Sequence, residues 1–259
     1  MSARVHVDDA GPVATVRLDG PKRHNVLDVE GWRAVGAAFR SLSDKDDLRC
    51  IAVCGTGSRA FSAGSDIAAF DAQRSSPEDV RAYSAAISQA MYAIRVCRHP
   101  TVAIIRGLCV GGGLEIAACC DLRVCGESSR FGAPINRLGL TMSHDELEPL
   151  LQLVGPGPVL EILLSGELID ADRAKMVGLV NRVWPDEDVV DEGYGLVGRI
   201  AAGAPLVNRW HKKFVRRLLQ RHPLTNDERE EAHDAFETED YREGRNAFLE
   251  KRDPDFRGS

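Results

Sequence analysis

Apolar residues recur along the chain in two kinds of spacing, and the spacing changes several times. Short apolar or alternating runs that end near glycine or proline indicate strands. The predicted strands occupy residues 14–19, 50–55, 101–105 and 122–125. Apolar positions three and four residues apart indicate helices, and these occupy residues 28–42, 77–97 and 114–120. Because strands and helices alternate, we predict an α/β fold with crossover connections.

The composition changes near residue 204, after which the sequence reads as helical throughout. Residues 210–221 form a strongly basic segment, and residues 225–248 form a second, charge-rich one. Both segments are amphipathic, so their apolar faces need a partner surface. We therefore predict two parts, a core of residues 1–200 and an all-helical region of residues 201–259.

Composition narrows the class of protein. Of the 259 residues, 44% are hydrophobic and 28% are charged, which is typical of a soluble globular enzyme. The net charge of −6 gives a nucleic-acid role no electrostatic support. Seven cysteines, most of them in apolar runs, indicate free thiols in a reducing compartment, and we expect a cytoplasmic protein. The sequence has no pattern typical of a metal site, a signal peptide or a membrane span.

Two glycine-rich segments are the first candidates for chemistry. Residues 55–66 are predicted to be a loop in which Gly64 lets the backbone turn, so that the amide of Ser65 can face a cleft. Residues 111–113 are three glycines between a strand and an apolar helix, and a helix N-terminus offers unpaired N–H groups to an oxyanion. The alternatives are a plain surface loop for the first segment, and tight strand–helix packing or a phosphate loop for the second. The Walker and dinucleotide spacings are both absent.

Glu115 is the charged residue closest to the second glycine segment. It lies among Leu114, Ile116 and Ala117, where burial of a carboxylate is costly. Burial would raise its pKa toward the range that is useful for proton transfer. A satisfied structural glutamate at a helix N-terminus is the alternative.

Several motifs together resemble the enoyl-CoA hydratase/isomerase (crotonase) family, nearly from end to end. Besides the two glycine segments, the motifs that carry the resemblance lie at residues 21–27, 131–134, 166–180 and 243–252. The resemblance implies a crotonase-like (ClpP-like) ββα spiral core with a C-terminal helical trimerisation region. It also implies a homotrimer or a homohexamer that acts on an acyl-CoA thioester, with coenzyme A as part of the substrate and no separate cofactor.

The resemblance also assigns site residues. The amides of Ser65 and Gly112 would form an oxyanion hole for the thioester oxygen, and Glu115 would act as acid or base. The positions that would contact coenzyme A are Lys22, Arg23, Ala63, Asp66, Ile67, Phe248 and Lys251. Phe248 and Lys251 would reach the nucleotide of a neighbouring subunit.

One position departs from the family pattern. The second glutamate of the hydratases follows the proline of a Phe-Gly-x-Pro motif, and here Ile135 takes its place. His144, Asp145 and Glu146 are candidate substitutes, and of these we retain His144 and Asp145 as candidate catalytic residues. The alternative for all three is capping of the helix that runs through residues 150–154.

Three functions therefore remain open. Hydration or dehydration of a 2-enoyl-CoA is the commonest chemistry of the family and ranks first. An isomerase needs a single shuttling base, which Glu115 could supply, while Ile135 favours a binder of acyl-CoA that has lost its chemistry. A scaffolding oligomer is a weaker alternative. Arg74 and Arg81 could receive a polar or acidic acyl tail, although exposed arginines are commoner.

Overall fold

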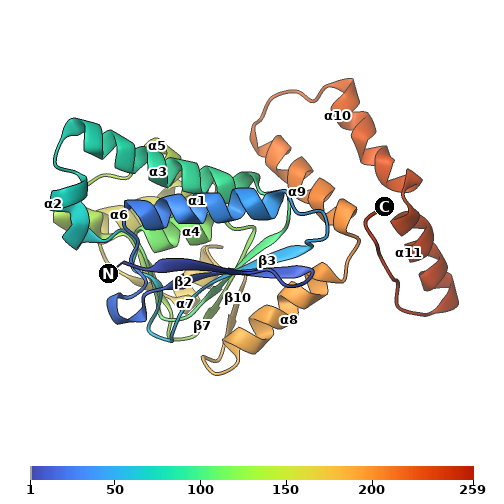
Figure 1. Cartoon of the computed structure of the whole chain (residues 1–259), viewed down its shortest axis with the longest axis horizontal. Coiled ribbons are helices and arrows are strands. Elements are labelled where there is room, and N and C mark those ends of the chain that lie inside the picture. The colour runs from blue at the N-terminus through green and yellow to red at the C-terminus, as the bar shows by residue number, and fades with distance from the viewer. Residues whose placement is uncertain (1) are drawn as a thin grey trace.

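Two sheets lie at the centre of the fold (Figure 1), and the computed structural model describes residues 2–259. The larger sheet has the strand order β1-β2-β3-β5-β7-β10, and the smaller has the order β4-β6-β8-β9. The strands are β1 Arg4–Asp8, β2 Val13–Asp19, β3 Cys50–Gly55, β4 Ala60–Ser62, β5 Thr101–Ile105, β6 Leu108–Val110, β7 Leu122–Gly126, β8 Arg130–Gly132, β9 Ile169–Asp170 and β10 Arg182–Trp184.

Besides these strands, residues 2–259 form eleven α-helices and four 3-10 helices. The α-helices are α1 Val29–Ser43, α2 Phe70–Gln73, α3 Pro77–Val96, α4 Gly112–Cys119, α5 His144–Val154, α6 Pro156–Ser165, α7 Ala171–Met176, α8 Val189–Ala201, α9 Pro205–Leu219, α10 Asn226–Glu230 and α11 Glu239–Glu250. The 3-10 helices are η1 Pro21–Arg23, η2 Ile67–Ala69, η3 Pro134–Leu138 and η4 Glu231–Glu237.

The chain winds through both sheets as a spiral. Each turn contributes one strand to the larger sheet, the next strand to the smaller sheet, and then a helix. The successive turns are β3-β4-α3, β5-β6-α4 and β7-β8-α5, and their strands pair in parallel within each sheet. The predicted ββα spiral is therefore confirmed.

Side chains of the larger sheet alternate between two apolar layers. Ile51 and Val53 of β3 belong to the main core, whereas Cys50 and Ala52 belong to a second cluster beneath α8. This period of two is what a strand buried on both faces requires. Figure 1 shows α8 on one side of the sheet and α1, α3 and α4 on the other.

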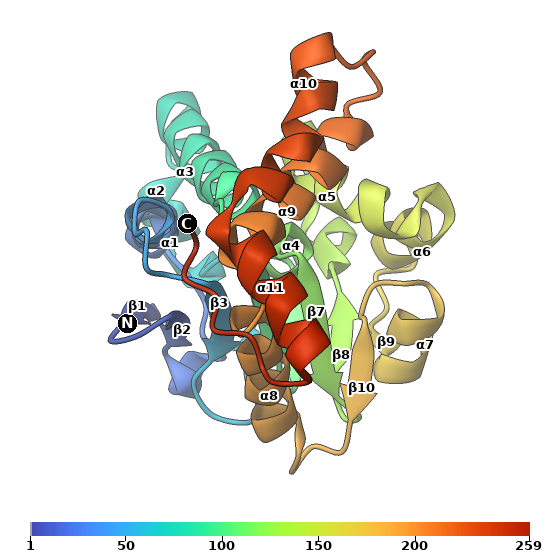
Figure 2. The same ribbon diagram turned by 90° about the vertical axis from the view of Figure 1, so that its right-hand side faces the viewer.

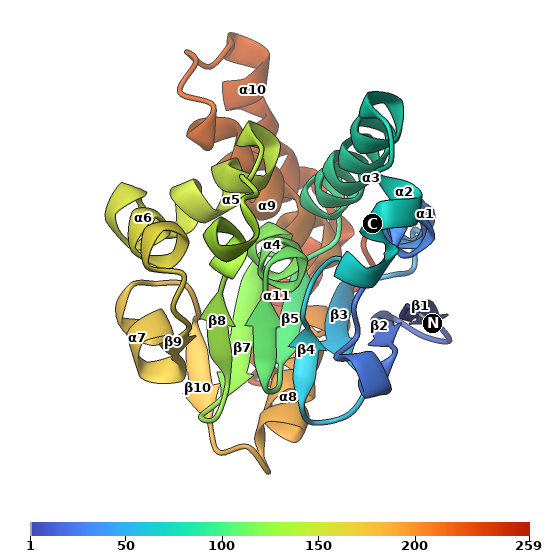
Figure 3. The ribbon, with the colours of Figure 1, turned by 90° about the vertical axis from the view of Figure 1, so that its left-hand side faces the viewer.

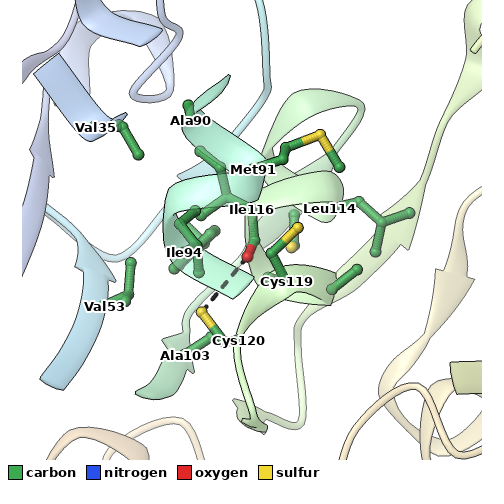
Figure 4. Packing of buried hydrophobic residues seen from close by; sticks show 14 of the residues in the cluster. Val35, Val53, Ala90, Met91, Ile94, Ala103, Leu114, Ile116, Cys119 and Cys120 are labelled. Carbon is green, nitrogen blue, oxygen red and sulfur yellow. Dashed lines mark hydrogen bonds between the residues drawn. The ribbon is translucent and has the colours of Figure 1, made fainter. Parts of the chain in front are cut away.

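Helix α4 lies inside the main core and is buried along its whole length. Figure 4 shows Leu114, Ile116 and Cys119 of α4 beside Met91 and Ile94 of α3. An apolar helix packed on several sides cannot shift without opening cavities. The first turn of α4 is therefore held in one place.

Three expectations from the sequence need correction. The loop at residues 55–66 contains the short strand β4, and the apolar helix begins at Gly112 rather than at residue 114. The stretch 225–248 is divided among α10, η4 and α11, because the backbone of Thr238 is extended and its hydroxyl caps α11. Figure 2 shows α9, α10 and α11 as the helical C-terminal region.

The predicted division at residue 200 stays a prediction, and α8 ends one residue beyond it. Within residues 2–259, no helix is both long and apolar enough to cross a bilayer.

Candidate functional site

The two glycine segments lie against each other. Gly64 has a φ of +87°, and a Cβ atom built on it would lie 2.5 Å from the nitrogen of Gly112. A Cβ atom on Gly112 would lie 2.5 Å from the ring of Trp32. Glycine at both positions therefore lets the two backbones meet, and this contact joins β4 to the start of α4.

The amides of Ser65 and Gly112 have no acceptor among the residues that the structure describes. Gly112 is the first residue of α4, whose first amides have no partner within the helix. Ser65 is held from both sides, because Leu27 N–H donates to the carbonyl of Gly64 at 2.8 Å and Asp66 N–H donates to that of Leu27 at 2.7 Å. The indole of Trp32 also donates to the Ser65 hydroxyl at 3.2 Å. Two fixed donors are thus free to bind an oxyanion.

A cavity of about 140 Å³ opens beside these amides. Its walls come from both glycine segments, from α2, from η3 and from the start of α5. Figure 3 shows α2, α4 and α5 beyond the same end of the strands. No group of three or more potential metal-ligating side chains occurs within residues 2–259.

Glu115 lines this cavity from the first turn of α4. Its side chain is only 6% exposed, and the structure gives it no hydrogen-bond partner in residues 2–259. The pKa of Glu115 is raised to about 8, mainly by burial and in smaller part by the carboxylate of Glu146, while Arg74 acts in the opposite direction. Near neutral pH, Glu115 is therefore mostly a neutral acid that can give a proton and take it back.

The position of the missing carboxylate is also part of the cavity. Ile135 lines the wall and supplies only apolar surface there. Glu146 lines the same cavity from the third position of α5. Its Oε2 atom accepts a hydrogen bond from Ser143 N at 2.6 Å, while the Ser143 hydroxyl accepts one from Glu146 N at 3.4 Å. This reciprocal capping box leaves Oε1 without a described protein partner.

The structure does not bring His144 or Asp145 to the cavity. Both side chains are exposed in the first turn of α5, and neither lines the cavity wall. First-turn residues of a helix point in different directions, so only one of the three candidate substitutes can face inward. The spacing Ser143-x-x-Glu146 is a capping-box signature, and it would have singled out Glu146 in the sequence.

Of the residues expected to contact coenzyme A, two lie at the cavity itself. Ala63 and Ile67 line its wall. Arg23 binds Asp66 through two hydrogen bonds, of 2.6 and 2.5 Å, at the side of the first glycine segment. Lys22 lies next to Arg23 in η1 and is exposed.

Asp66 has its carboxylate fully engaged by protein groups. Besides the two bonds from Arg23, Oδ2 accepts from the hydroxyl of Ser2 at 2.9 Å and Oδ1 accepts from Ala68 N at 3.1 Å. Burial acts to raise the pKa of Asp66, but the hydrogen bonds from Ser2 and Arg23 hold it below its ordinary value. The side chain therefore fixes the loop, and only the backbone of Asp66 would be available to contact a ligand.

Phe248 and Lys251 lie far from the cavity. Phe248 is 82% exposed on α11, and Lys251 ends that helix in a left-handed conformation. Figure 1 places α11 at the opposite side of the molecule from α2, whose residues line the cavity. The expected contact of Phe248 and Lys251 with the nucleotide of a neighbouring subunit stays a prediction.

Two supporting residues carried no signal in the sequence. Trp32 and Tyr83 occupy apolar helical positions, which usually indicate core packing. In the structure Trp32 holds the Ser65 hydroxyl, and Tyr83 donates to the carbonyl of Leu27 at 3.2 Å. The polar atoms of these aromatic side chains therefore support the first glycine segment.

Known proteins are similar to this chain over almost its whole length. The profile of the family described as enoyl-CoA hydratase/isomerase matches residues 8–259. A crotonyl-CoA hydratase of Syntrophomonas wolfei is 31% identical over 94% of each chain. A carnitinyl-CoA dehydratase of Salmonella enteritidis is 30% identical over the full length of both. A solved structure from Magnetospirillum magneticum, described as an enoyl-CoA hydratase/carnithine racemase, has a TM-score of 0.96 and 41% identity, and the match covers 98% of this chain and 96% of that one.

Proposed function

The chain belongs to the enoyl-CoA hydratase/isomerase family, and we propose that it adds water to a 2-enoyl-CoA or removes it from the 3-hydroxyacyl-CoA. The observation that carries this proposal is a buried carboxyl, Glu115, in the same cavity as two unpaired amides. Relatives described as a hydratase and a dehydratase support the same reaction class.

The two amides would stabilise the charge that forms on the thioester. As water adds to the β-carbon, the electron pair of the double bond moves onto the thioester oxygen and gives an enolate. The N–H groups of Ser65 and Gly112 would donate to this oxygen, and Gly112 stands at the positive end of the α4 dipole. Because both amides are already held in place, no reorganisation is required when the charge appears.

The carboxyl groups of Glu115 and Glu146 would transfer the protons. Glu146 would take a proton from the attacking water, whose oxygen bonds to the β-carbon. The neutral Glu115 would give its proton to the α-carbon as the enolate collapses. Transfer of the proton from Glu146 back to Glu115 would then restore the starting state. Pairs of carboxyls with different environments can divide acid and base roles in this way.

Isomerisation is the second candidate, and Ile135 is the observation that favours it. A double-bond shift needs one base that removes a proton from one carbon and returns it to another. Glu115 alone could do this, and Glu146 would then only cap α5. A binder without chemistry would bind acyl-CoA and turn over neither type of substrate.

Rates on crotonyl-CoA and on a 3-enoyl-CoA distinguish these functions. The hydratase should act on crotonyl-CoA, and Glu115→Gln should lower kcat by about 10²–10⁴-fold. Glu146→Gln should also lower hydration strongly, although glutamine still serves in a capping box. Isomerase activity that survives Glu146→Gln would favour the second candidate, whereas full hydration by Glu115→Gln would contradict the first.

The oligomer and the coenzyme-A contacts complete the proposal. We propose a homotrimer or homohexamer in which Phe248 and Lys251 contact the nucleotide bound to a neighbouring copy, with Lys22 and Arg23 on the other side. The distance of α11 from the cavity supports a contribution from another copy. Sedimentation of the protein should show three or six chains, and a stable monomer with full activity would contradict this arrangement.

A further inference from the structure

Arg74 lines the cavity, and the proposed hydration gives it no role. Its guanidinium carbon lies 3.9 Å from the centroid of the Phe70 ring and 4.0 Å from that of the Tyr83 ring. The two rings meet edge to face, with centroids 5.9 Å apart. Cation–π contacts with two rings hold the guanidinium in one position. Arg74 is therefore a fixed cation of the cavity wall.

This cation has no acceptor in the described part of the chain. Its Nε atom is buried without a hydrogen-bond partner. Glu115 and Glu146 line the same cavity, yet the hydrogen bonds that Glu146 forms within residues 2–259 go to Ser143 and not to Arg74. A guanidinium carries five donors, and leaving the buried Nε donor unpaired costs free energy. An acceptor brought by the ligand would remove that cost.

The cavity limits the size and the charge of this ligand group. Its volume is about 140 Å³, which favours a short acyl group over a long one. A guanidinium matches the planar, two-oxygen geometry of a carboxylate. A quaternary ammonium group in the same place would meet a like charge, and a plain alkyl end would leave Arg74 unpaired.

We propose that Arg74 binds a carboxylate at the far end of the acyl chain, so that the substrate is the CoA thioester of a short dicarboxylic acid. The carboxylate would accept two parallel hydrogen bonds from the guanidinium. This inference rests on the proposed function, because the amides of Ser65 and Gly112 fix the thioester end. Because the protein would bind both the thioester and the carboxylate, it would select substrates by the length and the charge of the acyl group.

A pair of substrates with the same number of heavy atoms in the acyl chain tests the effect of the charge. The carboxylate in 4-carboxybut-2-enoyl-CoA is replaced by an isopropyl group in 5-methylhex-2-enoyl-CoA. For the wild type, kcat/KM should be about 10- to 100-fold higher for the carboxylate substrate, the range expected for hydrogen bonds to a charged group. Arg74→Gln should abolish most of this preference, mainly through KM. Arg74→Lys should retain part of it, because the charge stays and the paired donors are lost.

Arg81→Gln is the matched control. Arg81 is exposed on α3, pairs with Glu78 and does not line the cavity, so this variant should keep the wild-type preference. Arg74 also opposes the rise in the pKa of Glu115, and a role through Glu115 alone would change the rates on both substrates equally. Equal losses on both substrates in Arg74→Gln would therefore overturn the carboxylate site.

Binding separates this inference from the proposed reaction. Calorimetry with the saturated thioesters 4-carboxybutanoyl-CoA and 5-methylhexanoyl-CoA needs no turnover. Tighter binding of the carboxylate thioester by the wild type, lost in Arg74→Gln, supports the site even where no hydration occurs. Hydration of crotonyl-CoA with equal binding of both thioesters would leave the proposed function intact and overturn the carboxylate site.

Discussion

Replacing Glu115 by glutamine removes a buried ionisable group and leaves the shape of the side chain almost unchanged. Glu115 is 6% exposed, and its pKa rises from an ordinary value of 4.5 to about 8. In the unfolded chain the same carboxyl ionises near its ordinary pKa. Between these two values the folded chain binds more protons than the unfolded chain, so its stability falls as the pH rises.

The size of the effect follows from the two pKa values. Each pKa unit corresponds to about 1.4 kcal/mol. At pH 7 the buried carboxyl should cost about 3 kcal/mol of unfolding free energy, and at pH 5 about 0.8 kcal/mol. Glutamine has no proton to lose, so Glu115→Gln should be more stable than the wild type at pH 7. The advantage should shrink by about 2 to 3 kcal/mol at pH 5.

Urea unfolding at pH 5, 6 and 7 measures this difference. The two proteins are compared at one protein concentration, because the stability of an oligomer depends on concentration. Glu127→Gln is the matched control, since Glu127 is exposed after β7 and forms no ion pair in residues 2–259. Its unfolding free energy should stay within about 0.5 kcal/mol of the wild type at each pH.

The pH trend is the decisive part of the result. The buried amide of glutamine carries its own desolvation cost, which is the same at every pH and cannot create a trend. A difference between Glu115→Gln and wild type that stays constant from pH 5 to pH 7 would refute the reasoning. Water would then reach Glu115 freely, and the carboxyl would not be the neutral acid that hydration requires near neutral pH.

Three further changes test the parts that hold the site together. Gly64→Ala should lower kcat by about 10²–10³-fold, because its Cβ would lie 2.5 Å from the nitrogen of Gly112 and displace one oxyanion donor; steady-state rates check this. Ser143→Ala should lower the free energy of urea unfolding by about 1 kcal/mol through loss of the α5 cap. Asp66→Asn should cost about 2 kcal/mol at pH 7 by weakening the pair with Arg23. The pKa of Asp66 is lowered by folding, so this cost should fade below pH 3.8, and a cost at pH 3 as large as at pH 7 would contradict it.

Elements with a long, regular pattern were predictable from the sequence. β3 and β5 are apolar over five or six residues, and α1 and α3 keep one apolar face over four or five turns. β4 has only three residues, which is too short for a period of two to stand out, and its pairing with β6 depends on residues far along the chain. The predicted strands therefore correspond to β2, β3, β5 and β7 of the larger sheet, whereas β1, β10 and all four strands of the smaller sheet were missed.

Some residues of the candidate site could likewise be predicted from the local sequence, and others could not. The importance of Gly64, Gly112 and Glu115 could be read locally, since glycine before an apolar helix and a lone carboxyl within it are local signals. The position of Arg74 between Phe70 and Tyr83 could not, because Tyr83 reaches it from a different helix. In the sequence Arg74 looks like a surface arginine. Its cation–π contacts hold it in the cavity wall, and the spacing of residues along the chain does not predict those contacts.

Glu146 shows why the missing carboxylate was difficult to place. Side chains in the first turn of a helix point back toward the N-terminus, and at the third position the capping box draws the carboxylate onto the residue before the helix. The segment before α5, which includes Thr141 and Met142, is itself a wall of the cavity. The hydrogen bond to Ser143 N therefore holds the carboxylate next to this wall, in the same cavity that Ile135 lines. If Glu146 is the base that we propose, one side chain both starts α5 and activates water, so the geometry of the reaction depends on the first turn of that helix being formed.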